Sequence, residues 1–315
     1  MLDPQARAFL DQVAASNRPP IESLPLADAR ALFDETFSRL AGPPVDVGRV
    51  EDVQADGPRG PIPVRVYTPQ LARAPLPMLV WYHGGGWVCG GLDSYDALCR
   101  MLTRESGCIV ASVDYRLAPE HPAPEQFDDA FAALEWLAAH ASELGADATR
   151  LAVGGDSAGG GLAASVALKA RDVGGPALAY QLLVYPAVSS GVKTASYETY
   201  GEGHFLTNDR IDFYWKCHIP QPEMVEIPYV CASRAETLRG LPPTTIVMAD
   251  CDPLWDEGVA YAERLRADGV PVELRVYNGM IHAFFSFFGI FDQGREAVTD
   301  AGKALGAALL HGAPV

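Results

Sequence analysis

Positive charge is scarce in this chain. Its 315 residues include 24 lysines and arginines against 40 aspartates and glutamates, which gives a formal net charge of −16 at pH 7. Nucleic acids and anionic membrane surfaces attract basic patches, so this balance argues against both as partners. We therefore expect no nucleic-acid partner and no stable membrane association.

Long apolar runs are missing as well, and the first residues do not predict a secretory leader. No apolar run approaches the roughly 20 residues of a membrane span, and Met1-Leu2-Asp3-Pro4 leads into mixed amphipathic sequence without a basic start. A signal peptide would need that basic start followed by an apolar core. Together these features predict a cytoplasmic protein.

Motifs for metals and nucleotides are also lacking. The six cysteines are scattered, with no Cys-x-x-Cys pair and no cysteine and histidine spacing suited to zinc. The glycines at 154–155 and 159–161 come without the lysine of a phosphate-binding loop and without dinucleotide spacing. We therefore expect no metal site and no bound nucleotide.

Apolar segments of strand length recur along the chain, which is 49% hydrophobic. Helical periodicity separates most of the later segments; Phe127, Phe131 and Leu134, for example, recur at three- and four-residue intervals. This alternation predicts an α/β fold with an eight-stranded, mostly parallel sheet, helices on both faces and an antiparallel edge. The expected strands are residues 45–54, which is the weakest, and 62–68, 78–82, 108–115, 151–155, 179–185, 244–249 and 271–277.

A Gly-Asp-Ser-Ala-Gly sequence at residues 155–159 lies between a strand-like segment and a helix-like one at 161–171. A serine on such a turn holds its side chain clear of the backbone, and the flanking glycines are needed because larger side chains would crowd the turn. Ser157 is therefore the predicted nucleophile. Since such a motif arises by chance in roughly one chain in ten of this size, the neighbouring motifs decide its meaning.

A His-Gly-Gly-Gly sequence at residues 83–86 directly follows the apolar segment 78–82. The N–H groups of Gly84, Gly85 and Gly86 are not covered by side chains, so they can point at a developing oxyanion. Ala158, just after the serine, would supply another donor. The alternative interpretation is a glycine-rich turn at the end of a strand.

A serine hydroxyl needs a histidine base and a carboxylate that orients the base. Among the downstream histidines, only His282 lies in a loop directly after a strand-like segment, so it is the predicted base. His204 and His218 fall in a segment that interrupts the alternation, and His311 lies in a Gly/Ala/Pro-rich tail. We expect these three to be surface histidines.

Four carboxylates follow the strand-like segment 244–249: Asp250, Asp252, Asp256 and Glu257. Asp252 is the predicted acid because it precedes a proline, which disfavours helical dihedrals and keeps Asp252 in the loop. Asp250 stays the alternative, with a turn-capping role otherwise. Asp256 and Glu257 suit the first turn of the next helix, where negative charge is favourable.

Together with residues 114–122 (Asp-Tyr-Arg-Leu-Ala-Pro-Glu-His-Pro), Tyr185-Pro186 and Asp252-Pro253-Leu254, these motifs resemble the bacterial hormone-sensitive lipase family. The resemblance implies the α/β-hydrolase fold. It also implies hydrolysis of short- to medium-chain acyl esters by Ser157, His282 and Asp252 through an acyl-enzyme, with no metal or organic cofactor.

The resemblance leaves other activities open. An amidase of the arylacetamide-deacetylase kind would use the same three residues, and a lipase would act on longer acyl chains. A non-catalytic receptor on this fold would have lost the base, whereas His282 is present. A homodimer through an exposed sheet edge is a further expectation.

Two segments, residues 1–43 and 188–237, fall outside the alternation and leave 44–187 and 238–315 as the catalytic domain. The family resemblance implies that the two segments form a helical cap over the active site. Candidates for lining its pocket are Trp87, Phe205, Leu206, Phe213 and Tyr214, with ordinary cap packing as the alternative. The aromatic run at 284–291 fits packing against the core better than an exposed patch.

Overall fold

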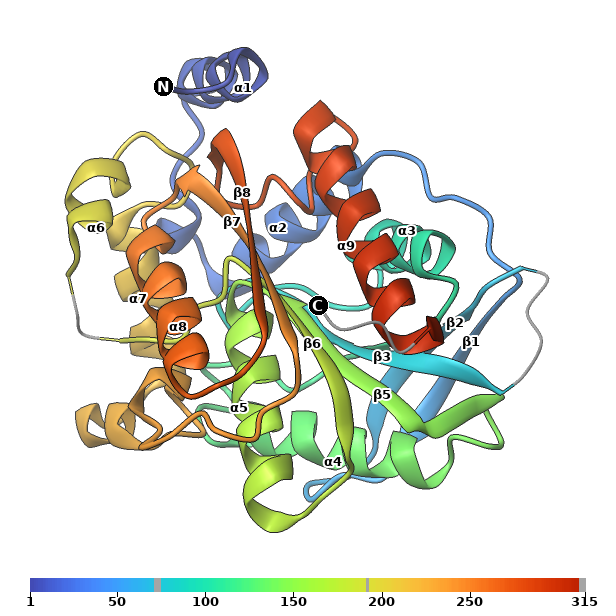
Figure 1. Cartoon of the computed structure of the whole chain (residues 1–315). Helices are drawn as coiled ribbons and strands as arrows, with labels where there is room; N and C mark the ends of the chain where they lie inside the picture. The colour runs from blue at the N-terminus through green and yellow to red at the C-terminus, as the bar shows by residue number, and fades with distance from the viewer. Residues whose placement is uncertain (71–74, 191–192, 312–315) are drawn as a thin grey trace.

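The computed structural model describes residues 1–70, 75–190 and 193–311, and its centre is an eight-stranded sheet (Figure 1). The strands are β1 (Arg49–Ala55), β2 (Ile62–Thr68), β3 (Leu76–Tyr82), β4 (Ile109–Val113), β5 (Ala146–Asp156), β6 (Leu178–Val184), β7 (Thr244–Cys251) and β8 (Val272–Ile281). They lie in the order β1-β2-β4-β3-β5-β6-β7-β8. β2 runs antiparallel to β1 and β4, and the other neighbours are parallel, which confirms the predicted sheet and its antiparallel edge.

Helices cover both faces of this sheet. They are α1 (Pro4–Ala15), α2 (Leu26–Ala41), α3 (Asp96–Ser106), α4 (Glu125–Ala139), α5 (Ala158–Val173), α6 (Ala195–Tyr200), α7 (Asn208–His218), α8 (Trp255–Ala267) and α9 (Asp292–His311), with short 3-10 helices η1 (Ile21–Ser23), η2 (Pro222–Glu226) and η3 (Ala232–Arg234). α3 packs against α9 and α4 packs against α5, on opposite faces (Figure 1). Because both faces are covered, every residue of β3 and β4 is buried, which explains their continuous apolar sequences.

The strand ends gather the predicted site residues at one edge of the sheet. β3, β5, β7 and β8 are parallel, so their carboxyl ends face the same way. His83, Ser157, Asp252 and His282 each directly follow one of these strands. In open α/β sheets, this edge is where ligands bind.

The end of β8 differs from the prediction. Residues 278–281, expected as a loop, continue β8 as far as Ile281, which pairs with Cys251 of β7. Gly279 has a φ of 79°, and the pairing shifts register between Ala249 and Cys251. The positive φ suits glycine and lets the strand resume after the irregularity. A glycine that follows an asparagine is also typical of a turn, which is why the sequence of residues 278–281 predicts a loop.

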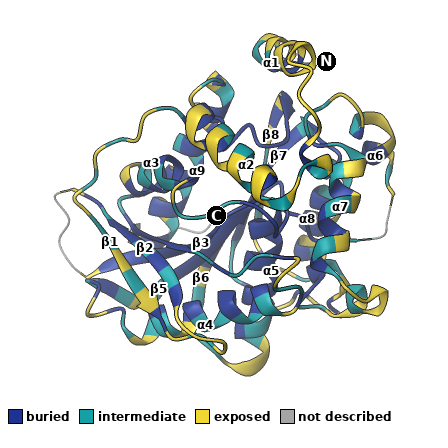
Figure 2. Cartoon of the chain, turned by 180° about the vertical axis from the view of Figure 1, so that it is seen from behind, coloured by how far each residue is buried: buried dark blue, intermediate teal, exposed yellow. Residues whose placement is uncertain are grey.

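The two segments outside the alternation contain α1, η1 and α2 at the N-terminus, and α6, α7, η2 and η3 between β6 and β7. α1 and the outer side of α2 carry most of their residues exposed, whereas the central strands are buried (Figure 2). Within the described ranges, no helix is both long and apolar enough to cross a membrane.

The aromatic run after His282 is buried. Phe284, Phe285 and Phe287 have no exposed surface. The ring of Phe287 lies 4.8 Å from that of Phe37 in α2 and 5.8 Å from that of Phe9 in α1. The packing interpretation is therefore correct, and Phe287 attaches both N-terminal helices to the body of the molecule.

Candidate active site

Ser157 occupies a strained position between β5 and α5. Its φ of 54° and ψ of −119° lie outside the regions that side chains favour. A Cβ at Gly159 would lie 1.9 Å from the carbonyl oxygen of Tyr82, and one at Gly155 would lie 2.4 Å from the carbonyl of Gly159. Only glycine fits at either position, which is the physical reason for the sequence of the elbow.

Three predicted residues meet at this turn. Oγ of Ser157 lies 3.0 Å from Nε2 of His282, and Nδ1 of His282 lies 2.7 Å from Oδ2 of Asp252. Asp252 is fully buried, and its Oδ1 accepts a hydrogen bond from the N–H of Leu254 at 2.9 Å. That hydrogen bond holds the carboxylate in place. When Nδ1 of His282 carries an N–H directed at this carboxylate, Nε2 has no proton and can accept that of Ser157.

The alternative acid lies elsewhere. Oδ1 of Asp250 accepts the N–H of Gly279 at 2.6 Å, which holds the irregular part of β8 against β7. Asp256 and Glu257 fall in the first turn of α8, as their sequence indicates. Among the described residues, Asp252 is the carboxylate within hydrogen-bonding distance of His282.

The expectation of surface histidines is wrong for His218. This residue is 2% exposed, and its ring stacks on Trp87 with centroids 4.1 Å apart. Burial lowers the pKa of His218 to about 3, so it packs as a neutral ring. Nδ1 of His204, by contrast, lies 2.7 Å from the carbonyl oxygen of Glu202 on the surface. His311 is the last residue of α9, and its side chain lies outside the described part of the structure.

Gly84 does not offer the oxyanion donor that the sequence suggested. Its N–H donates to Oδ1 of Asp156 at 2.9 Å and to the hydroxyl of Tyr95 at 3.0 Å. A Cβ at Gly84 would lie 2.6 Å from Oδ2 of Asp156, so the glycine allows this close approach. Its contribution is to attach the loop to the elbow.

Asp156 and Tyr95 were missed by the sequence analysis. Asp156 is 2% exposed, and its Oδ2 accepts from the hydroxyls of Tyr95 at 2.9 Å and Ser286 at 3.3 Å. Burial raises the pKa of Asp156 to about 6, although these hydrogen bonds lower it. The aspartate next to the serine in the elbow motif was a usable signal, but Tyr95 lies 61 positions away and had none.

Gly85 and Gly86 differ from Gly84 in their backbone N–H groups. Their φ values are 112° and 62°, and the carbonyl of Gly85 closes the turn by accepting the N–H of Cys89 at 2.9 Å. Within the described residues, no acceptor takes a hydrogen bond from the N–H of Gly85 or Gly86. Both glycines line the same cavity as Ser157 and His282. Ala158 begins α5, where the first N–H groups of a helix lack helical partners.

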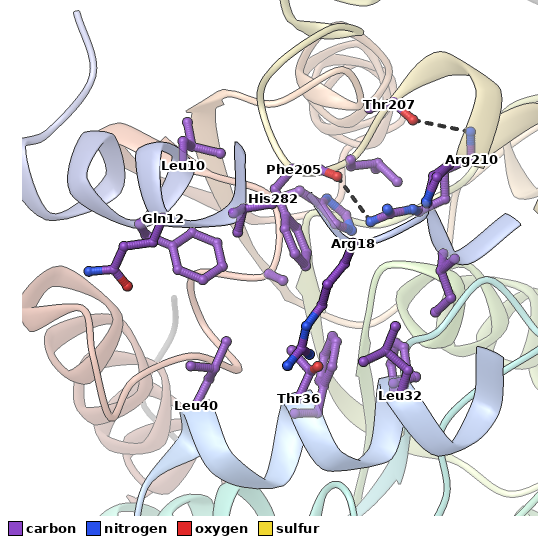
Figure 3. Close-up of a pocket in the computed structure, with 18 of the residues that line it drawn as sticks. Leu10, Gln12, Arg18, Leu32, Thr36, Leu40, Phe205, Thr207, Arg210 and His282 are labelled. Atoms are coloured by element: carbon purple, nitrogen blue, oxygen red, sulfur yellow. Dashed lines mark hydrogen bonds between the residues drawn. The ribbon is translucent and has the colours of Figure 1, made fainter. Parts of the chain in front are cut away.

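A cavity of about 850 Å³ opens beside Ser157 and His282. Its walls come from α1, α2, the chain between them, and the start of α7 (Figure 3). Phe205, Leu206 and Tyr214 line it. A volume of this size is typical of small-molecule sites.

A second, narrow pocket of about 20 Å³ is also lined by Ser157. Trp87, Leu206, Tyr214 and Trp215 line it, and His282 does not. Phe213 lines neither space; its ring lies 5.6 Å from that of Tyr214. Four of the five predicted pocket residues therefore border one or both spaces.

A serine on a glycine-flanked elbow, beside a histidine and a carboxylate that follow neighbouring parallel strands, defines a hydrolase of the α/β type. Residues 79–286 match the family described as alpha/beta hydrolase fold. The chain belongs to this family, and the resemblance to its hormone-sensitive-lipase-like members is confirmed.

Similar proteins carry esterase names. Carboxylesterase NlhH of Mycobacterium tuberculosis is 44% identical over 251 residues, which cover 79% of each chain. An arylesterase of Saccharolobus solfataricus is 36% identical and covers 90% of this chain and 92% of its own. The ester-hydrolase EH1AB1 from the metagenome of Lake Arreo has a solved structure with 40% identity and a TM-score of 0.95, over 98% of this chain and 99% of that one.

Proposed function

We propose that this protein is a serine carboxylesterase in which Ser157 is the nucleophile, His282 the base and Asp252 the acid. The observation that carries the proposal is the continuous pair of contacts, 3.0 Å from Ser157 to His282 and 2.7 Å from His282 to Asp252. The esterase names of similar proteins favour ester bonds as the target. A serine hydroxyl becomes a competent nucleophile in such an arrangement.

The reaction proceeds through an acyl-enzyme. Nε2 of His282 takes the proton of Ser157, whose Oγ attacks the ester carbonyl carbon and forms a tetrahedral oxyanion. The free N–H groups of Gly85 and Gly86, with that of Ala158, hold this oxyanion. The alcohol leaves with the proton from His282, and a water activated by the same nitrogen then releases the acid.

The two spaces beside Ser157 take the two halves of the ester. Because His282 protonates the leaving alcohol, the alcohol lies on the side of His282, which is the large cavity. The acyl group then enters the narrow pocket, where about 20 Å³ is free. Space for about one water-sized group favours acetyl and propionyl esters over long chains, and therefore an esterase over a lipase.

Three further assignments belong to this proposal. Residues 1–43 and 188–237 form a cap on the catalytic domain of residues 44–187 and 238–315, since both segments contribute cavity walls. The exposed edge of the sheet at β8, where Val276 is 37% exposed, supports a homodimer that light scattering would reveal as a doubled mass. Placement in the cytoplasm stays a prediction from the sequence.

The test is hydrolysis of p-nitrophenyl esters from acetate to palmitate by the parent and by Ser157→Ala. We expect activity to peak at short acyl chains and to vanish in the variant. p-Nitroacetanilide, which has the same acyl and aryl groups as p-nitrophenyl acetate, separates an amidase from an esterase. Turnover of the anilide without the ester, or full activity of Ser157→Ala, would overturn the proposal.

A further inference from the structure

The large cavity has a basic lining in a chain of net charge −16. Arg18, Arg39 and Arg210 border it, and Asp156 is the acidic residue that does so among the described residues. Asp156 is buried and already accepts hydrogen bonds from Gly84, Tyr95 and Ser286. The charge available to a ligand in this cavity is therefore positive.

One of these arginines, Arg210, has other partners. Nε of Arg210 lies 3.2 Å from Oε2 of Glu22, and its Nη1 donates to the carbonyl of Phe205 at 3.0 Å. Arg39 lies in the last turn of α2, where a cation is favoured by the helix dipole. In residues 1–70, 75–190 and 193–311, no acceptor takes a hydrogen bond from the guanidinium of Arg18 or of Arg39. Arg18 differs from Arg39 because it lies outside the helices, in the chain between α1 and η1.

The backbone presents Arg18 to the cavity. Asn17 has a φ of 48°, a left-handed conformation that asparagine tolerates, and it turns the chain at the end of α1. Pro19 and Pro20 follow, and a residue before proline is restricted to extended conformations. Figure 3 shows the Arg18 side chain pointing toward Thr36 of α2, which lines the same cavity.

We propose that Arg18 makes this enzyme selective for esters whose alcohol part carries a carboxylate. The inference rests on the proposed function, in which the alcohol part occupies the large cavity that Arg18 borders. A planar guanidinium binds a carboxylate through two parallel hydrogen bonds. Arg18 would thus hold the far end of the substrate while Ser157 attacks the ester at the near end.

The test compares 4-acetoxybenzoate with methyl 4-acetoxybenzoate, two acetyl esters in which the carboxylate of the alcohol part is free or methylated, and it measures release of acetate so that the methyl ester bond does not contribute. We expect the parent to prefer the anionic ester and Arg18→Ala to raise its KM about tenfold. kcat and the kinetics of the neutral ester should stay within about twofold, because Arg18 does not touch the reacting atoms. Arg18→Lys, which keeps the charge, should retain most of the preference.

A matched control separates a local contact of Arg18 from the electrostatic effect of removing one positive charge anywhere on the protein. Arg7 is exposed on α1 and does not border the cavity, so Arg7→Ala should leave the preference unchanged. If the ratio of kcat/KM for the two esters is the same in the parent and in Arg18→Ala, the role of Arg18 is overturned while the esterase function stands. Failure of the parent to hydrolyse these two esters while it hydrolyses p-nitrophenyl acetate would overturn the proposed selectivity alone, and failure on p-nitrophenyl acetate as well would overturn both proposals.

Discussion

The backbone N–H of Gly84 donates a hydrogen bond to Oδ1 of Asp156 at 2.9 Å. Asp156 precedes Ser157 in the elbow, and Gly84 precedes the two glycines with free N–H groups. The contact therefore fixes the position of the proposed nucleophile relative to the proposed oxyanion donors. Tyr95 completes it, since its hydroxyl accepts from Gly84 at 3.0 Å and donates to Asp156 at 2.9 Å.

Removing the Asp156 carboxylate should slow the chemical step. In Asp156→Ala we expect kcat for p-nitrophenyl acetate to fall about 100-fold with KM nearly unchanged, because oxyanion donors act mainly in the transition state. Asp156→Asn keeps an acceptor for Gly84 and should lose about tenfold or less. Steady-state kinetics measures both, with circular dichroism as the folding control. A rise in KM alone would show that Asp156 does not position the oxyanion loop.

The two candidate acids give opposite expectations. Asp252→Asn should lower kcat by about four orders of magnitude, as in other triads, because the imidazole loses the carboxylate that orients it. Asp250→Asn should stay within a few-fold of the parent, since an amide oxygen can still accept the N–H of Gly279. Kinetics of both variants on one ester decides. The reverse order of the two losses would identify Asp250 as the acid.

Enlarging the narrow pocket should change acyl preference. Ile211 is 5% exposed and lines the narrow pocket only. In Ile211→Ala we expect the ratio of kcat/KM for p-nitrophenyl hexanoate to that for acetate to rise about tenfold, the effect of a few methylenes in an apolar pocket. Leu40 is equally buried but lines only the large cavity, so Leu40→Ala is the matched control. Equal shifts in both variants would contradict the assignment of the acyl side.

Local signals explain how much of this molecule could be predicted. β2 lies at its predicted residues because its alternating apolar residues face a core on one side. The meeting of Ser157, Asp252 and His282 could be predicted because each directly follows an apolar strand or carries a motif of its own. Parallel strands then bring them together without any further information from the sequence.

Long-range contacts explain what could not be predicted. β5 starts at Ala146, five residues before its predicted start, because Ala146 pairs with Leu76, although the four residues that follow it are mostly polar and none is buried. His218 has a polar, ionisable side chain. Its ring is nevertheless buried against that of Trp87, which lies more than a hundred positions earlier in the chain. No periodicity within a segment reports such contacts.

Glu257 is a buried carboxylate outside the proposed triad. It is 7% exposed; its Oε1 accepts the N–H groups of Val188 at 2.9 Å and Ser189 at 3.2 Å, and its Oε2 accepts the hydroxyl of Tyr197 at 3.2 Å. Burial raises the pKa of Glu257 from 4.5 to about 8, although these hydrogen bonds lower it. Glu257 therefore connects α8 to the beginning of the segment between β6 and β7.

This raised pKa predicts a pH-dependent stability. Between pH 4.5 and about 8 the folded protein keeps a proton on Glu257 that the unfolded chain has lost. The contribution of Glu257 to the free energy of unfolding is therefore greatest below pH 4.5 and falls as the pH rises toward 8, by up to ~1.4 kcal/mol per pH unit. In Glu257→Gln this dependence should disappear, because the amide stays neutral while its oxygen still accepts from Val188 and Ser189.

Denaturant unfolding at pH 5, 6, 7 and 8 measures the effect as the difference between the parent and Glu257→Gln. We expect the variant to gain stability relative to the parent at each step upward in pH. Glu263 is exposed on the same helix, so Glu263→Gln controls for the loss of one negative charge and should run parallel to the parent. If Glu257→Gln also runs parallel to the parent, Glu257 is ionised in the folded protein throughout this range, and the hydrogen bonds from Val188, Ser189 and Tyr197 outweigh its burial.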